Sequence, residues 1–342
     1  MAPKPASEWF PIVLGTMVLS LVSWIDSIVF NYNVFLGIGK IIYFIGIILF
    51  ILIFSLWSYR YISNPRLIKE DFNKLNRLSF TSFLGVLIFV IGFFFTVYVN
   101  ASSEVIHLLL YMYFIGYAIV LVVNILLGYK LFSQQIKPEE LNYSILVPSI
   151  ALSANIILSA PILPPSFPYI GKEETEIAYF MMLVAVGITF FQFIFIGTTA
   201  FLSHVNFKSA QSTPAIMIPV GASSIIAINI LIFPSYNYLN LFYFPSNFAL
   251  TIAIILWGFE IWNLTVALLL ALRHVKEKMP LTVWAYVFPV GISDFSDFLL
   301  YEETKLPVFL WSVSVMSVAI VLLYIYATIN TINIIKNKLN TR

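Results

Sequence analysis

The chain has 342 residues, of which 61% are hydrophobic and only 10% are charged, and its mean hydropathy is +0.95. Soluble domains carry about 25% charged residues, so this composition indicates a polytopic membrane protein without a sizeable soluble domain. There is no cysteine, which excludes disulfides and thiol catalysis. His107, His204 and His274 lie far apart without a metal-ligand spacing. We therefore expect no metal and no cofactor, and the net charge of +2 gives no sign of a nucleic-acid partner.

Ten segments are apolar and long enough to cross a bilayer, which takes about 20 helical residues. They cover residues 9–30, 36–62, 78–99, 105–132, 143–163, 177–202, 213–233, 247–272, 281–301 and 306–335. Residues 1–8 lack the basic region and cleavage site of a signal peptide, so the first span is expected to be retained. These spans predict an all-α membrane protein in which residues 1–342 form a single ten-helix domain.

The basic residues fall almost entirely on one side of the expected membrane. Fifteen of the eighteen Lys and Arg lie in the two termini and in the loops after the second, fourth, sixth and eighth spans. The opposite side has only Lys40, Lys172 and Lys305. Because short cytoplasmic segments carry the excess of Lys and Arg, this asymmetry predicts a multi-pass protein of the cell membrane with both termini in the cytoplasm.

The odd-numbered spans begin at a nearly constant interval of 65 to 70 residues. Such a fixed period is typical of one structural unit used repeatedly. We therefore expect five helical hairpins, at about 9–62, 78–132, 143–202, 213–272 and 281–335. The alternative is that any ten-span protein with short loops has a regular spacing.

Odd and even spans differ in composition. The odd spans contain helix-breaking prolines, among them Pro148, Pro219 and Pro289, whereas the even spans have none in their interiors and are bulky and apolar. Odd spans also carry small and polar residues. The candidates to line a pore are Thr16, Ser20, Gly85, Ser149, Ser153, Gly221, Ser224 and Gly291. We expect five inner helices around a hydrated passage and five outer helices facing lipid. The alternative is that the small residues only mediate helix packing.

No odd span contains Lys or Arg between its ends. An inner wall without a fixed cation cannot hold an anion tightly. It offers hydroxyl groups, helix breaks and an apolar constriction, which favours a conduit over a tight binding pocket.

Several short motifs resemble one known family. They are the first span, Glu8-Trp-Phe-Pro through Ser20, the loop motif Asn64-Pro-Arg with Phe72, Val147-Pro-Ser, Thr213-Pro-Ala-Ile with Pro219, and Trp284-Ala-Tyr-Val-Phe-Pro289. Together they are similar to the tellurite-resistance/dicarboxylate transporter family, which includes bacterial TehA proteins, fungal malate and sulfite transporters and plant guard-cell slow anion channels. The resemblance extends over the whole chain in span count and repeat length.

The resemblance implies a quasi-five-fold ring of hairpins, usually in a homotrimer with one pore per subunit. It implies passage of anions, from halide or nitrate to sulfite or dicarboxylate. The phenylalanine of the Phe-Pro motif closes the pore in the relatives, which makes Phe288 the candidate gate. Judged on the residues alone, an aromatic ring beside a helix break more often simply packs there.

The chain departs from the family pattern at two places. The third span has no proline, so Gly85 or Gly92 is expected to supply any irregularity there. Small residues generally follow the Phe-Pro turn in the family, whereas this chain has Asp294 and Asp297.

Four acids lie inside spans: Asp26, Glu260, Asp294 and Asp297. Ionisable groups at this depth are costly and count as functional candidates. A rise of about 1.5 Å per residue places all but Glu260 near the outer end of their spans. Asp26, Asp294 and Asp297 are therefore candidate protonatable groups of an outer vestibule.

The alternative for these acids is structural. Asp26 would pair with Lys40, and Asp297 would pair with Lys305 or with a hydroxyl group; by helical geometry Asp297 points away from Phe288 and toward an outer helix. Glu260 is expected to be a packing or hydrogen-bonded residue of an outer helix.

An enzyme and a scaffold or receptor are the alternatives from other classes of protein. The spacing of Asp294 and Asp297 is that of half a diphosphate site in membrane prenyltransferases. Such enzymes need two carboxylate clusters to hold Mg²⁺, and these two acids supply only one. We therefore do not expect an enzyme. A scaffold or receptor would need larger loops, and the longest, near residues 63–77, is expected to be a basic, solvated connector in contact with anionic lipid. The remaining choice, between a channel for small anions and a proton-coupled carrier of weak acids or dicarboxylates using Asp294 and Asp297, stays open.

Overall fold

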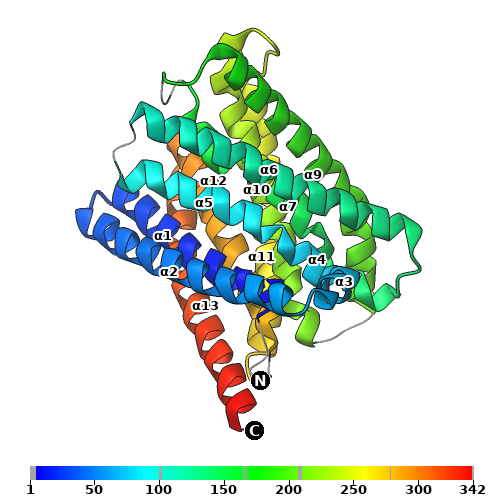
Figure 1. The fold of residues 1–342 in the computed structure, drawn as a ribbon. Helices are drawn as coiled ribbons and strands as arrows, with labels where there is room; N and C mark the ends of the chain where they lie inside the picture. The colour runs from blue at the N-terminus through cyan, green and yellow to red at the C-terminus, as the bar shows by residue number, and fades with distance from the viewer. Residues whose placement is uncertain are drawn as a thin grey trace.

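A computed structural model describes residues 5–99, 102–164, 166, 168–206, 210–277 and 279–340. Within these residues the secondary structure is helical, without strands (Figure 1). Ten helical segments of the described chain are long and apolar enough to cross a membrane, and they match the ten expected spans with ends that differ by a few residues. The prediction of an all-α, ten-span protein is confirmed.

Five long, continuous helices alternate with five segments that are interrupted. The continuous ones, here called the outer helices, are α2 (Asn33–Ser63), α6 (Ser103–Ser133), α9 (Lys172–Asn206), α11 (Ser246–Arg273) and α13 (Pro307–Asn340). Their most apolar stretches are only 17–39% buried, whereas the corresponding stretches of the interrupted segments are 56–89% buried. An apolar helix that is exposed on most of its surface is suited to contact with lipid.

The interrupted segments, here called the inner segments, are built from short pieces. They are η1 (Ser7–Trp9) with α1 (Phe10–Val29); α4 (Leu75–Thr81) with α5 (Phe83–Tyr98); η3 (Tyr143–Leu146) with α7 (Val147–Ser153) and α8 (Ile156–Ile162); η4 (Ala210–Met217) with α10 (Ile218–Ile232) and η5 (Phe233–Leu239); and η6 (Leu281–Tyr286) with α12 (Val287–Thr304). The remaining described pieces, α3 (Arg66–Asn73) and η2 (Pro138–Glu140), lie in loops.

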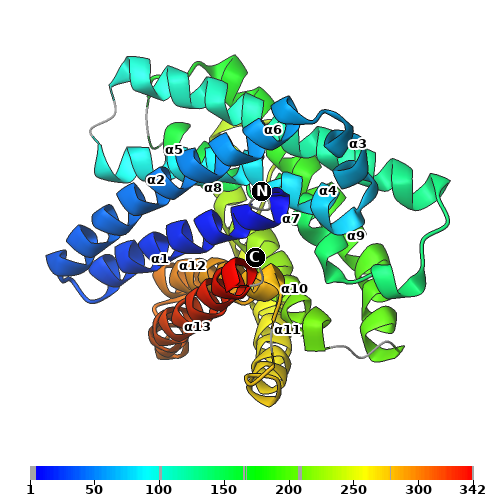
Figure 2. The ribbon, with the colours of Figure 1, turned by 60° about the horizontal axis from the view of Figure 1, so that its bottom comes forward.

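The inner segments contact one another in a closed cycle. Helix α1 contacts α5, α5 contacts α7, α7 contacts α10, α10 contacts α12, and α12 contacts α1. Figure 2 shows α11 and α13 at the periphery, outside α10 and α12. Both ends of the chain lie at the same end of the bundle (Figure 1), hereafter the terminal end.

The prolines mark the points where the inner segments change from 3₁₀ to α geometry. Pro148 and Pro219 are the second residues of α7 and α10, and Pro289 is the third residue of α12. Each α-helix follows directly on a 3₁₀ turn. A proline in the first turn of a helix costs no hydrogen bond, because the N–H groups of that turn have no partner within the helix. The prolines therefore fix where each α-helix begins.

The third span breaks at a different residue from the one expected. The chain leaves the helix at Ser82, between α4 and α5, where the Ser82 hydroxyl donates to the carbonyl of Ser79 over 2.6 Å. Neither Gly85 nor Gly92 interrupts α5, so that expectation was wrong. A serine hydroxyl that bonds to a backbone carbonyl competes with the backbone hydrogen bonds of the helix. In this span the serine interrupts the helix, as a proline does in other inner segments.

The loop near residues 63–77 is more ordered than the expected solvated connector. It contains α3, and its Asp71 side chain is only 2% exposed. Asp71 pairs with Arg60 at 2.8 Å and also with Arg77. Burial raises the pKa of Asp71, but the hydrogen bonds and charges of the two arginines outweigh burial and hold that pKa below its ordinary value. The loop is thereby tied to α2 and α4.

Candidate functional site

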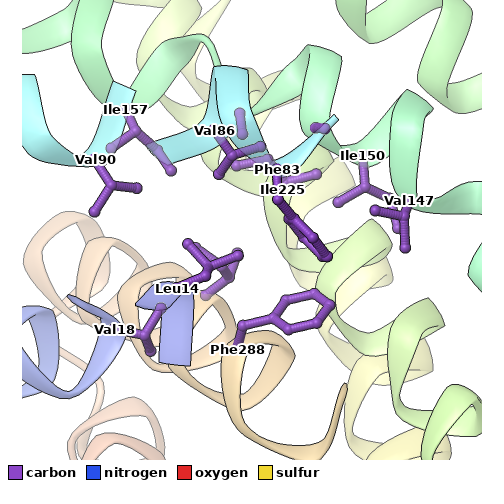
Figure 3. Close-up of a pocket in the computed structure, with 13 residues that line it drawn as sticks. Leu14, Val18, Phe83, Val86, Val90, Val147, Ile150, Ile157, Ile225 and Phe288 are labelled. Carbon is purple, nitrogen blue, oxygen red and sulfur yellow. The ribbon is translucent and has the colours of Figure 1, made fainter. Parts of the chain in front are cut away.

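A small apolar cavity lies at the centre of the inner segments. Its volume is about 30 Å³, and a cavity needs roughly 10–15 Å³ to hold one water molecule. Every inner segment contributes to its wall (Figure 3). The lining residues are Leu14, Val18, Phe83, Val86, Val90, Val147, Ile150, Ala151, Ala154, Ile157, Ile225, Phe288 and Ile292. The wall of the cavity is therefore apolar, in keeping with the apolar constriction expected between the inner helices.

Phe288 is placed in this cavity by α12. Its side chain is 5% exposed and meets the ring of Phe83 from α5 edge to face, with the ring centroids 5.2 Å apart. Figure 3 shows the Phe288 ring pointing from α12 into the space between the inner segments. Phe288 was predicted from its Phe-Pro motif, whereas Phe83 was not.

The Trp284 side chain holds the start of this segment against α13. Its indole N–H donates to the hydroxyl of Thr331 over 2.9 Å, and its ring packs edge to face on Tyr324. A Cβ atom on Gly15 of α1 would come within 2.7 Å of the same indole ring. The tryptophan thus fixes η6 between α1 and α13, and so fixes where the Phe-Pro turn begins.

The polar candidates for the pore wall do not line this cavity. None of Thr16, Ser20, Ser149, Ser153 and Ser224 is among the residues that line the cavity. Their hydroxyl groups are bonded within or between helices instead. The partners are Ile12 and Tyr324 for Thr16, Gly39 and Tyr98 for Ser20, Leu146 for Ser149, Thr189 for Ser153, and Val220 and Glu260 for Ser224. Hydroxyl groups at membrane depth need a partner, and facing a neighbouring helix supplies one.

The glycine candidates serve close approach between helices. A Cβ atom would lie 2.4 Å from Val120 at Gly85, 3.2 Å from Pro289 at Gly221 and 1.7 Å from Val18 at Gly291. None of the three glycines lines the cavity. The alternative reading of the small residues, as packing positions, describes these glycines.

The residues of the wall do carry a signal in the sequence. Four of the inner helices present apolar pairs one helical turn apart, which places both members on one face. The pairs are Leu14 with Val18, Val86 with Val90, Val147 with Ala151, and Phe288 with Ile292. Because these segments are apolar on all sides, the pattern does not stand out until the facing helices are known.

Asp294 and Asp297 lie on faces of α12 that do not line the cavity. Both side chains are fully buried, and neither lines the cavity. Asp297 accepts a hydrogen bond from Ser312 of α13, so it faces an outer helix. Asp26 is half-buried and accepts from Ser317 of α13 over 2.8 Å. The outer vestibule expected from span depth is therefore not where these carboxyl groups lie.

Asp297 has the hydroxyl partner that was one of its two expected partners, whereas Asp26 bonds to a hydroxyl group where Lys40 was expected. Among the described residues no ion pair joins Asp26 to Lys40 or Asp297 to Lys305; Lys305 pairs with Glu302 at 2.7 Å. Glu260 is hydrogen-bonded on α11, as expected, and its partners are Ser224 of α10 and Ser293 of α12.

Ten helices long and apolar enough to cross a membrane, with inner segments around a small apolar cavity, define a polytopic membrane protein. The comparison with protein families gives the same class: the SLAC1 family, described as "Voltage-dependent anion channel", matches residues 6–332. The chain belongs to this family of membrane anion channels and transporters, which confirms the resemblance found in the sequence motifs.

Two relatives from Methanocaldococcus jannaschii extend the comparison. "Uncharacterized transporter MJ0762" is 24% identical over 317 residues, covering 86% of this chain and 84% of the relative. "Uncharacterized transporter MJ0576" is 23% identical over 317 residues, covering 87% of this chain and 84% of the relative. The similarity therefore extends over most of the length of each chain.

Proposed function

We propose that this protein passes small inorganic anions or carboxylates through the centre of the inner segments, and that Phe288 is the gate. One observation carries the proposal: in a chain of the SLAC1 family, the Phe288 ring stands in the apolar cavity to which all five inner segments contribute. The five hairpins would then form a quasi-five-fold ring around one pore.

The proposed gate works by excluding water. A small constriction with an apolar wall stays dry, and an anion cannot cross it without losing its hydration. Displacement of the Phe288 ring from Phe83 would widen the constriction. Since the lining residues carry no charge, an ion that passes would be bound weakly and leave quickly.

We place the protein in the cell membrane with both termini in the cytoplasm. The support is the excess of Lys and Arg in the termini and the loops at the same end. That excess would also raise the concentration of anions at the cytoplasmic mouth. A homotrimer in contact with membrane lipid is proposed from the family resemblance.

The test is anion flux in liposomes that contain only the purified protein. Chloride, nitrate, sulfite and malate are compared at equal ionic strength, with empty liposomes as the control. Flux that depends on the protein and differs among the anions supports the proposal, and its absence for every anion contradicts it.

A second candidate is a proton-coupled carrier of weak acids or dicarboxylates that uses Asp294 and Asp297. The specific observation in its favour is that two fully buried carboxyl groups lie on the helix that carries Phe288. A proton gradient imposed across the same liposomes separates the candidates: it drives uphill anion uptake by a coupled carrier but not by a channel.

A further inference from the structure

The Glu260 side chain links two pore helices from outside the pore. It projects from α11, is fully buried, and lies between α10 and α12. Its Oε2 atom is 2.6 Å from the hydroxyl oxygen of Ser224 on α10, and its Oε1 atom accepts from the hydroxyl group of Ser293 on α12. One carboxyl group therefore bridges two helices that both line the cavity.

The hydrogen bonds of Ser224 indicate which atom carries the proton. The Ser224 oxygen lies 2.7 Å from the carbonyl oxygen of Val220 as well as 2.6 Å from Glu260 Oε2. A hydroxyl group has one hydrogen and can donate only one full hydrogen bond. If it donates to Val220, as serine commonly does in helices, the contact with Glu260 needs a hydrogen on Oε2. Both contacts are satisfied when Glu260 is a neutral carboxylic acid.

Asp294 supplies an independent observation. Its side chain is fully buried, and neither carboxyl oxygen has a hydrogen-bond partner among the described residues. It directly follows Ser293, whose hydroxyl group donates to Glu260. A buried carboxylate without a partner is costly, and such a group normally takes up a proton instead.

No cation balances these carboxyl groups within the described part of the chain. The ion pairs there do not include any of the four acids, and no group of three acidic or histidine side chains there is arranged to hold a metal ion. The helices packed against α12 are α1, α10, α11 and α13, with η6 at its start. Among the side chains that the structure describes, their other titratable or charged groups are the tyrosines Tyr286, Tyr324 and Tyr326 and the exposed end residues Arg273 and Lys336; α12 itself adds Tyr301, Glu302 and Glu303.

We propose that Glu260 and Asp294 form a proton-binding site inside the membrane, beside the anion path, and that Glu260 transmits proton binding to the pore helices α10 and α12. Of the four acids, Asp26 is half-buried and the other three are buried, so Asp26 is the most accessible to water. Asp297 accepts a hydrogen bond from Ser312 of α13. A proton passes from water to a carboxylate oxygen, and only O–H bonds form or break.

The site is joined to the cavity wall through single residues. Ser224 immediately precedes Ile225, and Ser293 immediately follows Ile292; both isoleucines line the cavity. Ionisation of Glu260 would leave a charge between α10 and α12 and break the arrangement in which Ser224 also bonds to Val220. The inference rests on the proposed anion conduction for its effect on flux, whereas proton binding itself can be measured without flux.

The direct test is infrared spectroscopy of the purified protein in lipid, in the region of the carboxylic-acid C=O stretch. At neutral pH we expect a band from buried protonated carboxyl groups. Glu260→Gln should remove one component of this band and Asp294→Asn another. Asp294→Asn is the safer variant for folding, because Asp294 makes no hydrogen bond that an amide would disturb. Glu302→Gln, at an exposed carboxylate paired with Lys305, is the matched control and should leave the band unchanged.

Two outcomes overturn the proposal. One is that the band persists in both Glu260→Gln and Asp294→Asn, which would mean that neither group holds a proton. The other is that replacing sodium with N-methylglucamine at constant pH changes the band, which would mean that the site holds a metal cation instead.

Flux measurements then test the link to the pore. Glutamine at position 260 mimics the protonated acid, so we expect anion flux through Glu260→Gln to lose the pH dependence of the wild type while that of Glu302→Gln keeps it. An unchanged pH profile in Glu260→Gln overturns the link. Absence of flux in every protein, including the wild type, would instead contradict the proposed function, and the infrared result would stand independently.

Discussion

The rings of Phe83 and Phe288 meet edge to face with their centroids 5.2 Å apart, although they belong to the second and the fifth inner segments. The contact crosses the middle of the bundle, because both rings line the central cavity. Each ring thus limits the space available to the other. This pair of residues therefore keeps the central cavity small.

Replacing Phe288 with alanine is expected to raise basal anion flux in liposomes. Removal of the ring enlarges a cavity of about 30 Å³ and lets water enter. A barrier lowered by about 1.4 kcal/mol corresponds to a rise of about tenfold in rate, and we expect at least this order. Phe132→Ala, at a phenylalanine that is 96% exposed on α6, is the control and should not change the flux. Equal flux in the wild type and Phe288→Ala would remove Phe288 as the gate.

A second substitution separates exclusion of water from steric blockage. Val86→Thr keeps the shape of a cavity-lining side chain but adds a hydroxyl group. If the constriction closes by staying dry, this change should raise flux even though no space is created. Val122→Thr, on the exposed face of α6, is the matched control. A flux increase with Phe288→Ala but none with Val86→Thr would indicate a purely steric gate.

The close contact between α12 and α1 should be sensitive to a single added methyl group. A Cβ atom at Gly291 would lie 1.7 Å from Val18 and 2.9 Å from Ile320. Gly291→Ala must push the helices apart, and overpacking of this kind costs about 1–3 kcal/mol. We expect a lower apparent melting temperature in detergent.

The control for this substitution is another helical glycine. Gly258 of α11 has no atom within 4 Å of an added Cβ, so Gly258→Ala should be neutral or stabilising by up to about 1 kcal/mol, as expected from helix propensity. If both alanine variants behaved alike, close packing at Gly291 would not be the cause.

The Asp71 carboxylate is expected to stabilise the terminal end of the bundle. Asp71→Asn leaves Arg60 and Arg77 close together without their shared partner. Because the arginines are partly exposed, the cost should lie between the roughly 1 kcal/mol of exposed pairs and the roughly 3–5 kcal/mol of buried ones. Thermal unfolding in detergent at neutral pH measures it.

The pH dependence of this effect has a definite sign. The pKa of Asp71 is lowered in the folded protein from its ordinary value of 3.8. The stabilisation is therefore complete above that ordinary value and is lost as the pH falls through the lower folded pKa. The difference in melting temperature between the wild type and Asp71→Asn should shrink only in this acidic window. Glu70→Gln, at the exposed neighbouring residue, should show no such convergence.

Much of the fold could be predicted because it depends on local composition. The ten spans follow from apolar length, and the positions of Pro148, Pro219 and Pro289 indicated where inner helices would be interrupted. The break at Ser82 was missed, because a serine that bonds to its own backbone has no distinctive sequence signature. The helix and buried Asp71 in the loop after α2 were also missed, because their arginine partners lie on α2 and α4.

The candidate site was predicted less completely. Phe288 was found through its Phe-Pro motif, whereas Phe83 was not, because nothing in its own segment distinguishes one phenylalanine from the next. The hydroxyl-bearing candidates such as Ser153 and Ser224 bond to other helices, which the sequence did not indicate. Their partners, Thr189 and Glu260, lie on neighbouring outer helices.

The sequence by itself determined the number of spans, their alternating character, and the family, because these depend on residue types and their spacing along one chain. Only the tertiary structure decided which face of each inner helix meets the central cavity. In a helix that is apolar on every side, composition does not set the rotation about the helix axis. Contacts with neighbours set it, such as Gly291 against Val18 and Ser293 with Glu260. Those contacts turn the acids of α12 away from the cavity and the ring of Phe288 into it.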